Sequence, residues 1–360
     1  MTDPRRAPGG FPVVGVVGGG QLARMLQPAA IALGVQLSVL AESPDASAAL
    51  VVPSAPVGDH GDLEAVRAFA ARCDVVTFDH EQVPAPVLAA LRADGVTLRP
   101  GPEALVHAQD KLAMRDRLSR AGVRCPRWAR ATSAAQVADF GAEVGWPVVA
   151  KAPRGGYDGK GVREVASAAD VGAIADWLDP AGHDAAGEGL RGAVLLEERV
   201  AFVRELAVLV ARSPSGQAAA WPVVETLQIG GVCAEVLAPA PGLDPGLAAT
   251  ATEVALRIAG DLEVVGVLAG EMFEVRDGSG APSYAVNELA MRPHNSGHWT
   301  IDGAVTSQFE QHLRAVLDLP LGDPSPRARW TVMANVLGGE YPQLYPAYLH
   351  VMARDPGAKV

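Results

Sequence analysis

The stretch VVGVVGGGQLARMLQPAAIALGVQLSVL (13–40) decides the fold class. In it an apolar run, three glycines, a helical pattern and a second apolar run follow one another. They predict a buried strand (13–17), a tight turn (18–20), a helix closed by Gly34 (21–34) and a second strand (36–40). Two strands joined through a helix predict a parallel sheet with a right-handed crossover, and therefore an α/β fold.

The same pattern continues along the chain. A helix is expected over 63–72, a strand over 74–78 and a helix over 84–95. We therefore expect a disordered tail over 1–12, followed by a Rossmann-like parallel-sheet domain over 13–102.

Three further regions follow by pattern. In the region 103–192 the residue pattern predicts one long helix (103–122, closed by Gly122), a strand (146–152), a helix (167–178) and a surface loop (179–189). The region 193–320 is mostly strand by pattern, with helices near 245–259 and 304–317. The Pro-rich segment 321–360 is weakly periodic and predicts a small, incomplete C-terminal domain.

Composition excludes several classes of function. The chain has 360 residues and a formal net charge of −11, which argues against nucleic acid as the main partner. No apolar run approaches the ~20 residues that span a bilayer, and the N-terminus lacks the apolar core of a signal peptide. Three widely spaced cysteines, Cys73, Cys125 and Cys233, fit reduced thiols. We therefore expect a cytoplasmic globular protein with no membrane partner.

The first motif is GVVGGGQ (15–21), with Glu42 following 22 residues after Gly20. Free amides at a helix N-terminus suit an anion, and an acid at that distance resembles the ribose-binding acid of a dinucleotide site. The glycine spacing is not G-x-G-x-x-G, however. A phosphate or another small ligand is therefore favoured over NAD, and a plain packing turn stays open.

The stretch KAPRGGYDGKGV (151–162) carries four glycines in seven positions between cationic side chains. Such a loop predicts a mobile hairpin of main-chain donors that can fold over a triphosphate, although it is not a Walker loop. Lys151 ends an apolar strand, where a charge is costly without an anionic partner. A flexible hairpin with solvated charges is the alternative.

A hairpin is predicted from the segments 264–275 and 283–289. If its turn is symmetric about its centre, Glu271 faces Glu288 across the two strands. Like charges at that position repel, so the pair predicts a cation, and oxygen ligands suit magnesium or manganese. Asn287 is a further candidate ligand. The alternative is that Arg292 alone neutralises one of the glutamates.

The segment RPHNSGHWT (292–300) gathers directional polar side chains around one glycine: Arg292, His294, Asn295, Ser296 and His298. A core does not need that density of polar groups, whereas a site for an oxyanion does. The H-x-x-x-H spacing also suggests zinc, but neither a helical pattern nor a nearby acid supports that alternative.

Two weaker signals remain. The strand pattern of VLLEERVAFVREL (194–206) ends in Glu197 and Glu198, with Glu205 beyond, and such acids can accept from ribose or adenine or can simply mark a strand edge. Lysine is also scarce, with 26 arginines against four lysines at 111, 151, 160 and 359. Three of the four fall within about fifty residues of one another, which is unusual, although a lone lysine such as Lys111 on an amphipathic helix is usually only solvated.

Taken in order, these motifs resemble the ATP-grasp superfamily. The shared features are Lys111, Lys151 with GGYDGKG (155–161), the EER…E segment, Glu271 and Glu288. Within that superfamily, GGGQLARM (18–25) and NELAMRPHNSGHWT (287–300) resemble the 5-(carboxyamino)imidazole ribonucleotide synthases, which are ATP-dependent carboxylases of purine biosynthesis. The resemblance covers about 13–320. It implies an ATP-grasp fold after the Rossmann-like domain, and a homodimer.

The resemblance also implies roles for individual residues. The ATP phosphates would be held by Lys111 and Lys151 and covered by Gly155, Gly156, Gly159, Lys160 and Gly161. Adenine and ribose would contact Glu197, main-chain groups from Glu198 to Val200, and Glu205. Magnesium would be bound by Glu271 and Glu288 with Asn287.

The remaining roles concern the two other substrates. Bicarbonate and the carboxyphosphate made from it would be held by Arg292, His294 and Asn295, with Glu81 nearby. The pocket for aminoimidazole ribonucleotide would be lined by Gly20, Gln21, Leu22, Tyr157 and Asp158. Bicarbonate would attack the γ-phosphate in line, under a closed lid that excludes water. Carbon dioxide released from carboxyphosphate would meet the exocyclic amine, with Asp158 or a histidine as general base.

Two features depart from the family pattern. Asp79 stands where the family usually has Glu. The family also ends with a basic segment that grips the ribonucleotide phosphate, whereas this chain stops at DPGAKV (355–360). We expect truncation rather than another mode of phosphate binding, and Lys359 is not assigned that role. The alternatives are another ATP-grasp ligase or a biotin carboxylase, a Rossmann oxidoreductase, and an inactive nucleotide-binding protein.

Overall fold

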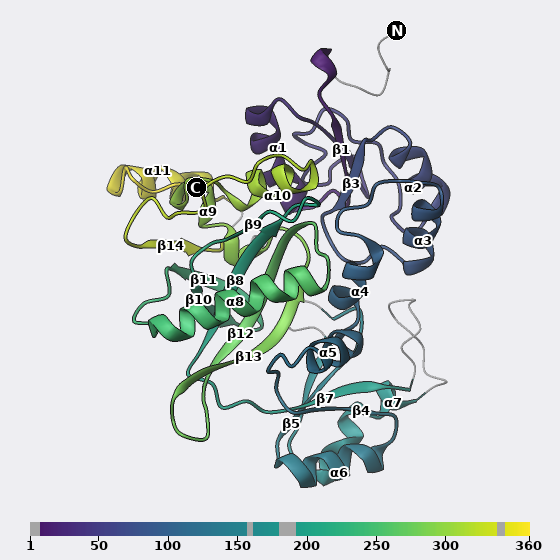
Figure 1. Ribbon diagram of the computed structural model, residues 1–360, viewed down its shortest axis with the longest axis vertical. Helices are drawn as coiled ribbons and strands as arrows, with labels where there is room; N and C mark the ends of the chain where they lie inside the picture. The colour runs from purple at the N-terminus through teal and green to yellow at the C-terminus, as the bar shows by residue number, and fades with distance from the viewer. Residues whose placement is uncertain (1–7, 157–160, 180–191, 337–342) are drawn as a thin grey trace.

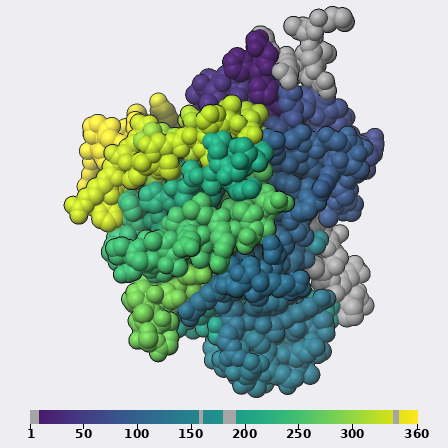
Figure 2. Space-filling model, viewed as in Figure 1, coloured from purple at the N-terminus to yellow at the C-terminus, as the bar shows by residue number. Residues whose placement is uncertain are grey.

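A computed structural model describes residues 8–156, 161–179, 192–336 and 343–360. Within them the chain forms three sheets, each with helices of its own (Figure 1). Figure 2 shows the N-terminal part in purple and blue, the central part in blue-green below it, and the rest in green and yellow beside both. The three parts pack against one another, so residues far apart in sequence can share a site.

The N-terminal sheet is parallel and has the strand order β2-β1-β3. Its elements are β1 (Val13–Val17), α1 (Gln21–Leu33), β2 (Gln36–Leu40), α2 (Leu63–Ala70), β3 (Val75–Phe78) and α3 (Ala85–Ala93). These elements confirm the predicted strands, helices and parallel α/β sheet. Every residue of β1 and β3 is buried, as expected for a parallel sheet covered on both faces. Within the expected tail, Pro8–Gly10 form a short 3-10 turn.

The central sheet is antiparallel, with the order β4-β7-β5-β6. Its elements are β4 (Trp128–Ala131), α6 (Ala134–Val144), β5 (Val148–Lys151), β6 (Val162–Val165) and β7 (Val194–Glu198). The expected single helix over 167–178 is wrong, because a 3-10 helix (Ala168–Ile174) precedes one turn of α7 (Ala175–Leu178). Val171 and Gly172 are poor helix formers in the middle of that segment. The loop expected over 179–189 lies almost wholly outside the described residues.

The largest sheet has seven strands in the described part of the chain, in the order β13-β12-β8-β10-β11-β14, with β9 paired to β8. The strands are β8 (Arg204–Arg212), β9 (Ala218–Ala220), β10 (Val224–Ile229), β11 (Val232–Ala238), β12 (Gly266–Arg276), β13 (Pro282–Ala290) and β14 (Thr331–Ala334). Leu206 and Val208 of β8 join the core under α8, while Ala207 and Leu209 join a second core on the opposite face. Both faces of β8 are therefore covered, so the strand is uniformly apolar.

The helices of this third part only partly match the predictions. They are α8 (Pro245–Asp261), a 3-10 turn (Asn295–Gly297), α9 (Thr300–Gly303), α10 (Gln308–Val316) and α11 (Tyr345–Arg354). The helix expected near 245–259 is confirmed, and Figure 1 shows it lying across the sheet. The helix expected over 304–317 begins only at Gln308, because the Ser307 side chain accepts from the Glu310 amide at 3.2 Å and caps it there.

The single helix expected over 103–122 is wrong. The chain forms α4 (Pro102–Gln109) and α5 (Lys111–Arg120), with Asp110 between them in an extended conformation (φ −127°, ψ 107°). The Asp110 carboxylate accepts from the amides of Leu112 at 2.9 Å and Ala113 at 3.0 Å. Asp110 is thus the N-cap of α5, and the break places Lys111 at the first position of a new helix.

The segment beyond residue 320 contains more structure than its pattern predicts. Strand β14 pairs with β11, and α11 lies beyond it with none of its residues buried. The domain boundaries at 102, 192 and 320 stay a prediction. No helix among the described residues is long and apolar enough to cross a bilayer.

Candidate active site

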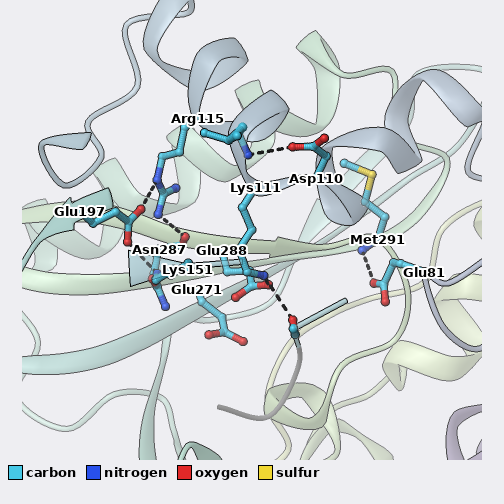
Figure 3. A network of polar contacts seen from close by, with 12 residues as sticks. Glu81, Asp110, Lys111, Arg115, Lys151, Glu197, Glu271, Asn287, Glu288 and Met291 are labelled. Carbon is cyan, nitrogen blue, oxygen red and sulfur yellow. Dashed lines mark hydrogen bonds and ion pairs between the residues drawn. The ribbon is translucent and has the colours of Figure 1, made fainter. Parts of the chain in front are cut away.

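The candidate site is built on the β12–β13 hairpin. Glu271 pairs directly with Glu288, as the symmetric turn predicted. The register shifts between Glu271 and Met272, so Asn287 is the extra residue of a β-bulge. The bulge brings Glu271, Asn287 and Glu288 to one small region, which Figure 3 shows as the centre of a polar network.

Lys111 reaches this pair from the start of α5. Its ammonium forms an ion pair with Glu288 Oε1 and donates to the carbonyl of Gly156 at 3.4 Å. Its own amide donates to the carbonyl of Pro153 at 2.8 Å. Lys111 is only 7% exposed, so its charge depends on these partners. The helix break at Asp110 therefore ties the glycine-rich segment to the carboxylate pair.

Lys151 approaches from the end of β5. Its Nζ lies 2.7 Å from Glu197 Oε2 and donates to Asn287 Oδ1 at 3.0 Å. The anionic partner that its buried position required is therefore Glu197, on the neighbouring strand β7. Arg115, which is fully buried, donates to the other oxygen of Glu197 and to the Asn287 carbonyl at 2.6 Å.

The predicted contact of the Glu197 carboxylate with adenine or ribose stays a prediction, and in this structure the carboxylate is paired with two cations. Both of its oxygens are engaged, one by Arg115 and the other by Lys151. Burial would raise the pKa of Glu197, but the two cations hold it below the usual value. Glu197 is therefore held as a charged group that orients Lys151.

The other residues predicted for adenine and ribose differ in where their side chains lie. The Glu198 side chain accepts from the Arg127 amide at 2.9 Å, and alternation along a strand puts it on the face opposite Glu197. Val200 is half-buried just after the strand. Glu205 lies on β8, paired with Phe273 of β12. Burial and the charge of Glu271 raise the pKa of Glu205 to about 7.

His294 brings the predicted anion-binding segment to the carboxylate pair. Its Nε2 lies 3.1 Å from Glu271 Oε1, and its Nδ1 is 2.8 Å from Ser296 Oγ. Gln308 of α10 clamps the His294 backbone, accepting from its amide at 2.8 Å and donating to its carbonyl at 2.7 Å. Burial would raise the pKa of Glu271, but His294, Lys151 and Lys111 together lower it.

Arg292 and Glu81 meet at the other side of this segment. Arg292 Nε donates to Glu81 Oε2 at 2.8 Å, and the Met291 amide donates to Oε1 at 3.3 Å. Glu81 follows strand β3, so this contact joins the N-terminal sheet to the hairpin. Asn295 Oδ1 is buried and has no hydrogen-bond partner among the described residues. An unpartnered buried acceptor in a site is expected to meet a ligand.

His298 does not join the carboxylate pair. Its Nδ1 lies 3.1 Å from Gln308 Nε2, and its ring stacks on Phe309 with centroids 5.8 Å apart. Burial lowers the pKa of His298 to about 4, so it is neutral at pH 7. These contacts favour a packing role for His298, and nothing in them supports the zinc alternative for His294 and His298.

The predicted ribonucleotide pocket begins at α1. Gly20 is the N-cap of this helix, and a Cβ there would lie 2.1 Å from Asp79 Oδ2. Asp79 Oδ1 accepts from the Ala23 amide at 2.6 Å. The Gln21 side chain accepts from Ser47 at 2.8 Å, and Leu22 is half-buried beside it. Only glycine fits at position 20, because the carboxylate caps the helix there.

Glu42 does not behave as the acid of a dinucleotide site. Both of its oxygens accept from the Gly19 amide, at 3.2 and 3.1 Å. The Glu42 carboxylate therefore binds the glycine turn itself, and this contact weighs against a dinucleotide site for NAD.

The glycine-rich segment is described only at its ends. Tyr157, Asp158, Gly159 and Lys160 lie outside the described residues. Gly155 and Gly161 both have positive φ, 71° and 75°. A Cβ on Gly161 would lie 3.0 Å from Gly156 Cα, so the two ends of the loop approach too closely for a larger residue.

Sequence reasoning assigned no role to three residues in and beside this network, Arg115, Asp79 and Gln308, although Asp79 was noted as a departure from the family pattern. Arg115 lies four residues after Lys111, the spacing that places two side chains on one helix face. Asp79 follows the carboxyl end of a predicted strand, where ligands of α/β sheets bind. Gln308 carried no sequence signal, because its contact with His294 depends on the tertiary fold.

Comparison with known proteins gives the same class as the fold and the site. The family model of the ATP-grasp domain matches residues 116–309, and that of the ribonucleotide synthetase preATP-grasp domain matches residues 12–109. The chain is thus an ATP-grasp protein of the ribonucleotide synthetase type.

The particular family follows from individual relatives. N5-carboxyaminoimidazole ribonucleotide synthase of Mycobacterium tuberculosis is 55% identical over 352 residues, which are 97% of this chain and 79% of that protein. The Thermus thermophilus synthetase structure is 37% identical, with a TM-score of 0.80, covering 91% of this chain and 84% of that one. The Aspergillus clavatus synthase in complex with ADP and 5-aminoimidazole ribonucleotide is 30% identical, with a TM-score of 0.82 and coverages of 96% and 87%. The chain belongs to the N5-carboxyaminoimidazole ribonucleotide synthase family.

Proposed function

We propose that the chain carboxylates the exocyclic amine of 5-aminoimidazole ribonucleotide, using ATP and bicarbonate and releasing ADP and phosphate, in purine biosynthesis. The observation that carries the proposal is the Glu271–Glu288 pair, placed between Lys111, Lys151 and His294. Such a cluster suits a reaction in which phosphate oxygens gain charge as bicarbonate attacks the γ-phosphorus. The family relationship supports the same substrates.

ATP would lie between the central sheet and the hairpin. Lys111 and Lys151 would exchange part of their contacts with Glu288 and Glu197 for phosphate oxygens, which keeps each ammonium paired. Gly155, Gly156 and Gly161 would supply main-chain donors at the ends of the covering loop, and Gly159 and Lys160 are proposed to complete it. Adenine and ribose are proposed to contact Glu197, main-chain groups at Glu198–Val200 and the Glu205 carboxyl.

Glu271, Glu288 and Asn287 would hold a magnesium or manganese ion. Two carboxylates and an amide carbonyl form the hard oxygen donor set that such an ion takes. The fit is supported by the facing glutamates, whose mutual repulsion is relieved by the cationic groups of Lys111 and Lys151 and by His294. When bound, the ion would neutralise negative charge on the phosphate oxygens of ATP.

Bicarbonate and carboxyphosphate would be held by Arg292, His294 and Asn295. Glu81 fixes the Arg292 guanidinium through a 2.8 Å bond from Nε, and a guanidinium held in this way suits an anionic ligand. Gln308 forms hydrogen bonds with the amide and the carbonyl of His294, and these bonds fix the position of this residue in the site. Exclusion of water matters most here, because carboxyphosphate hydrolyses readily.

The ribonucleotide would bind at the start of α1, beside Gly20, Gln21 and Leu22, with Tyr157 and Asp158 from the loop. The free amides of a helix N-terminus suit an anionic or polar group. Asp158 or a histidine would take the proton from the amine. We further propose a cytoplasmic homodimer with small-molecule substrates only. The free thiols of Cys73, Cys125 and Cys233 support a reducing compartment.

The test is phosphate release with ATP, magnesium, bicarbonate and 5-aminoimidazole ribonucleotide, on this chain and on one extended at its C-terminus. Glu271→Gln or Glu288→Gln is expected to lower kcat by about 10²-fold or more, because each removes a carboxylate charge that would hold the metal ion. Glu253→Gln, on the exposed side of α8, is the matched control and should turn over normally. Normal turnover in both site variants, or turnover that does not need the ribonucleotide, would contradict the proposal.

A further inference from the structure

We propose a second metal site, separate from the glutamate pair, at Glu42, His60 and His80. One ligand atom from each side chain lies within 4.8 Å of the other two. The site would take a divalent transition-metal ion of the zinc type. None of the three residues takes part in the contacts around Glu271 and Glu288.

The topology of the N-terminal sheet explains why these residues meet. Glu42 follows β2 and His80 follows β3, at the carboxyl edge of a parallel sheet. His60 follows the segment that runs beside β2 through the Ser38–Ser54 and Ala41–Val57 bridges. Carboxyl ends of parallel strands converge on one crevice, which is where α/β sheets bind ligands.

Contacts within the structure already orient two of the three side chains toward a common point. Glu42 is oriented by the Gly19 amide, which donates to both of its oxygens. His80 Nε2 lies 3.8 Å from Glu42 Oε1, and the rings of His60 and His80 meet edge to face with centroids 4.7 Å apart. Ligating carboxylates are commonly held by such second hydrogen bonds.

His60 gives an independent sign that a partner is missing. Its Nδ1 is shielded from solvent and has no hydrogen-bond partner among the described residues. The Asp59 carboxylate oxygen is 3.7 Å away, beyond hydrogen-bonding distance. A buried polar nitrogen is normally satisfied, so a bound ion or an ordered water is the expected partner.

The donor set decides the class of ion. Two imidazole nitrogens and one carboxylate oxygen form a known zinc set that leaves a position open for water or an anionic ligand. Zinc ligands sit about 2.0–2.2 Å from the ion, so the three atoms must close in by about 1 Å. The Glu42 side chain is 48% exposed and can make that movement. Magnesium prefers oxygen ligands and does not fit.

His80 must change its tautomer when the ion binds. The Gln82 amide donates to His80 Nδ1 at 3.1 Å, so the proton of the neutral ring sits on Nε2. Coordination through Nε2 moves that proton to Nδ1 and ends the bond from Gln82. The site is therefore expected to bind more weakly than one with the tautomer already set.

The experiment measures binding of Zn²⁺ alone to the full chain, by competition with a chromophoric chelator at pH 7.5. His60→Ala and His80→Ala are each expected to weaken binding at least ten-fold. Glu42→Gln is a second variant that keeps an oxygen for Gly19 and should weaken binding as well. His350→Ala, exposed on α11, is the matched control and should bind as the parent does. Far-UV circular dichroism checks that each variant is folded.

Two results would overturn the proposal. One is unchanged Zn²⁺ affinity in a folded His60→Ala/His80→Ala double variant. The other is loss of binding in His294→Ala together with displacement of Zn²⁺ by a hundred-fold excess of Mg²⁺, which would place the ion at the glutamate pair. The expected result is that Mg²⁺ leaves the bound Zn²⁺ in place. A Co²⁺-loaded protein should show the visible absorption of four-coordinate nitrogen and oxygen ligation.

Discussion

At the scale of single residues, the scarce lysines mark the site. Lys111 and Lys151 are both buried, and each ammonium is held by a carboxylate. Arginine serves most exposed ion pairs, as in Arg67–Asp94 and Arg163–Asp176. A compact ammonium fits between two oxygens from different strands, whereas a planar guanidinium needs a matching fork.

The first prediction follows from Lys151. Its Nζ is held between Glu197 Oε2 at 2.7 Å and Asn287 Oδ1 at 3.0 Å. Lys151→Arg keeps the charge but enlarges the group, so KM for ATP should rise and kcat should fall, about ten-fold or more in kcat/KM. Steady-state phosphate release measures both constants. Lys359→Arg, at the exposed end of the chain, is the control, and parental kinetics in Lys151→Arg would refute the size argument.

Sequence reasoning located the candidate residues better than it located their partners. His294, Asn295 and Arg292 stood out because directional polar groups rarely gather in an apolar core. Glu197 gave only a weak signal, as an acid at a strand end, and its engagement by Arg115 depends on the packing of α5 against β7 and β13. A sequence shows which side chains carry charge, and only the tertiary fold shows which charges neutralise one another.

At the scale of elements, the hairpin was predictable and its bulge was not. The symmetric turn set Glu271 opposite Glu288, because antiparallel register follows from turn length. The shift next to Met272 depends on how β12 also pairs with β8 along nine residues. Strand β12 therefore pairs with a strand on each side, and the extra residue of the bulge lies on the edge strand β13, at Asn287.

The break between α4 and α5 shows a second limit of pattern reasoning. The apolar periodicity of 103–122 continues across Asp110, so a single helix was expected. Asp is an ordinary residue within a helix by propensity, but it is strongly favoured as an N-cap. The contact of the Lys111 amide with the Pro153 carbonyl favours the capped form, and this contact joins residues that are far apart in the sequence.

The second prediction tests that break. Asp110→Ala removes the cap of α5 and the 3.1 Å contact with Arg154, and should lower the free energy of unfolding by about 1 kcal/mol. It should also raise KM for ATP, because Lys111 is the first residue of α5. Asp62→Ala removes the equivalent cap of α2, remote from the hairpin, and is the matched control. Urea unfolding and ATP kinetics separate the two effects, and equal KM changes in both variants would contradict the role of the break.

At the scale of the whole molecule, the N-terminal sheet and the large sheet share a core. Phe309, Leu313 and Val316 of α10 pack with residues of α1 and β2. His312 of the same helix is fully buried, with Nε2 2.8 Å from Thr77 Oγ1 of β3 and Nδ1 accepting from the Val267 amide of β12 at 3.2 Å. One side chain thus joins three elements, and this fixes Glu81 relative to Arg292. No local pattern could reveal a contact between residues 235 apart.

The last prediction concerns stability and pH. Burial lowers the pKa of His312 from its ordinary 6.5 to about 3. Between these values the unfolded chain binds a proton that the folded chain does not, so stability falls as pH decreases through this window. The slope is about 1.4 kcal/mol per pH unit below pH 6, or about 2 kcal/mol lost by pH 5. Elsewhere Asp79 and Glu205, with pKa values raised to about 6 and 7, act in the opposite sense, so the wild-type curve alone is not diagnostic.

The diagnostic quantity is therefore the difference between the wild type and His312→Gln. Glutamine can donate to Thr77 and accept from Val267, but it does not titrate. The variant is expected to be less stable at pH 7.5, because its shape differs in a close-packed core, and to lose less stability than the wild type between pH 7 and 5. Urea unfolding at pH 5, 6 and 7.5 measures both, with exposed His350→Gln as the control that should run parallel to the wild type. Parallel curves for His312→Gln and the wild type would show that the buried ring does not carry this pH dependence, and that the junction between the two sheets is held by its apolar contacts.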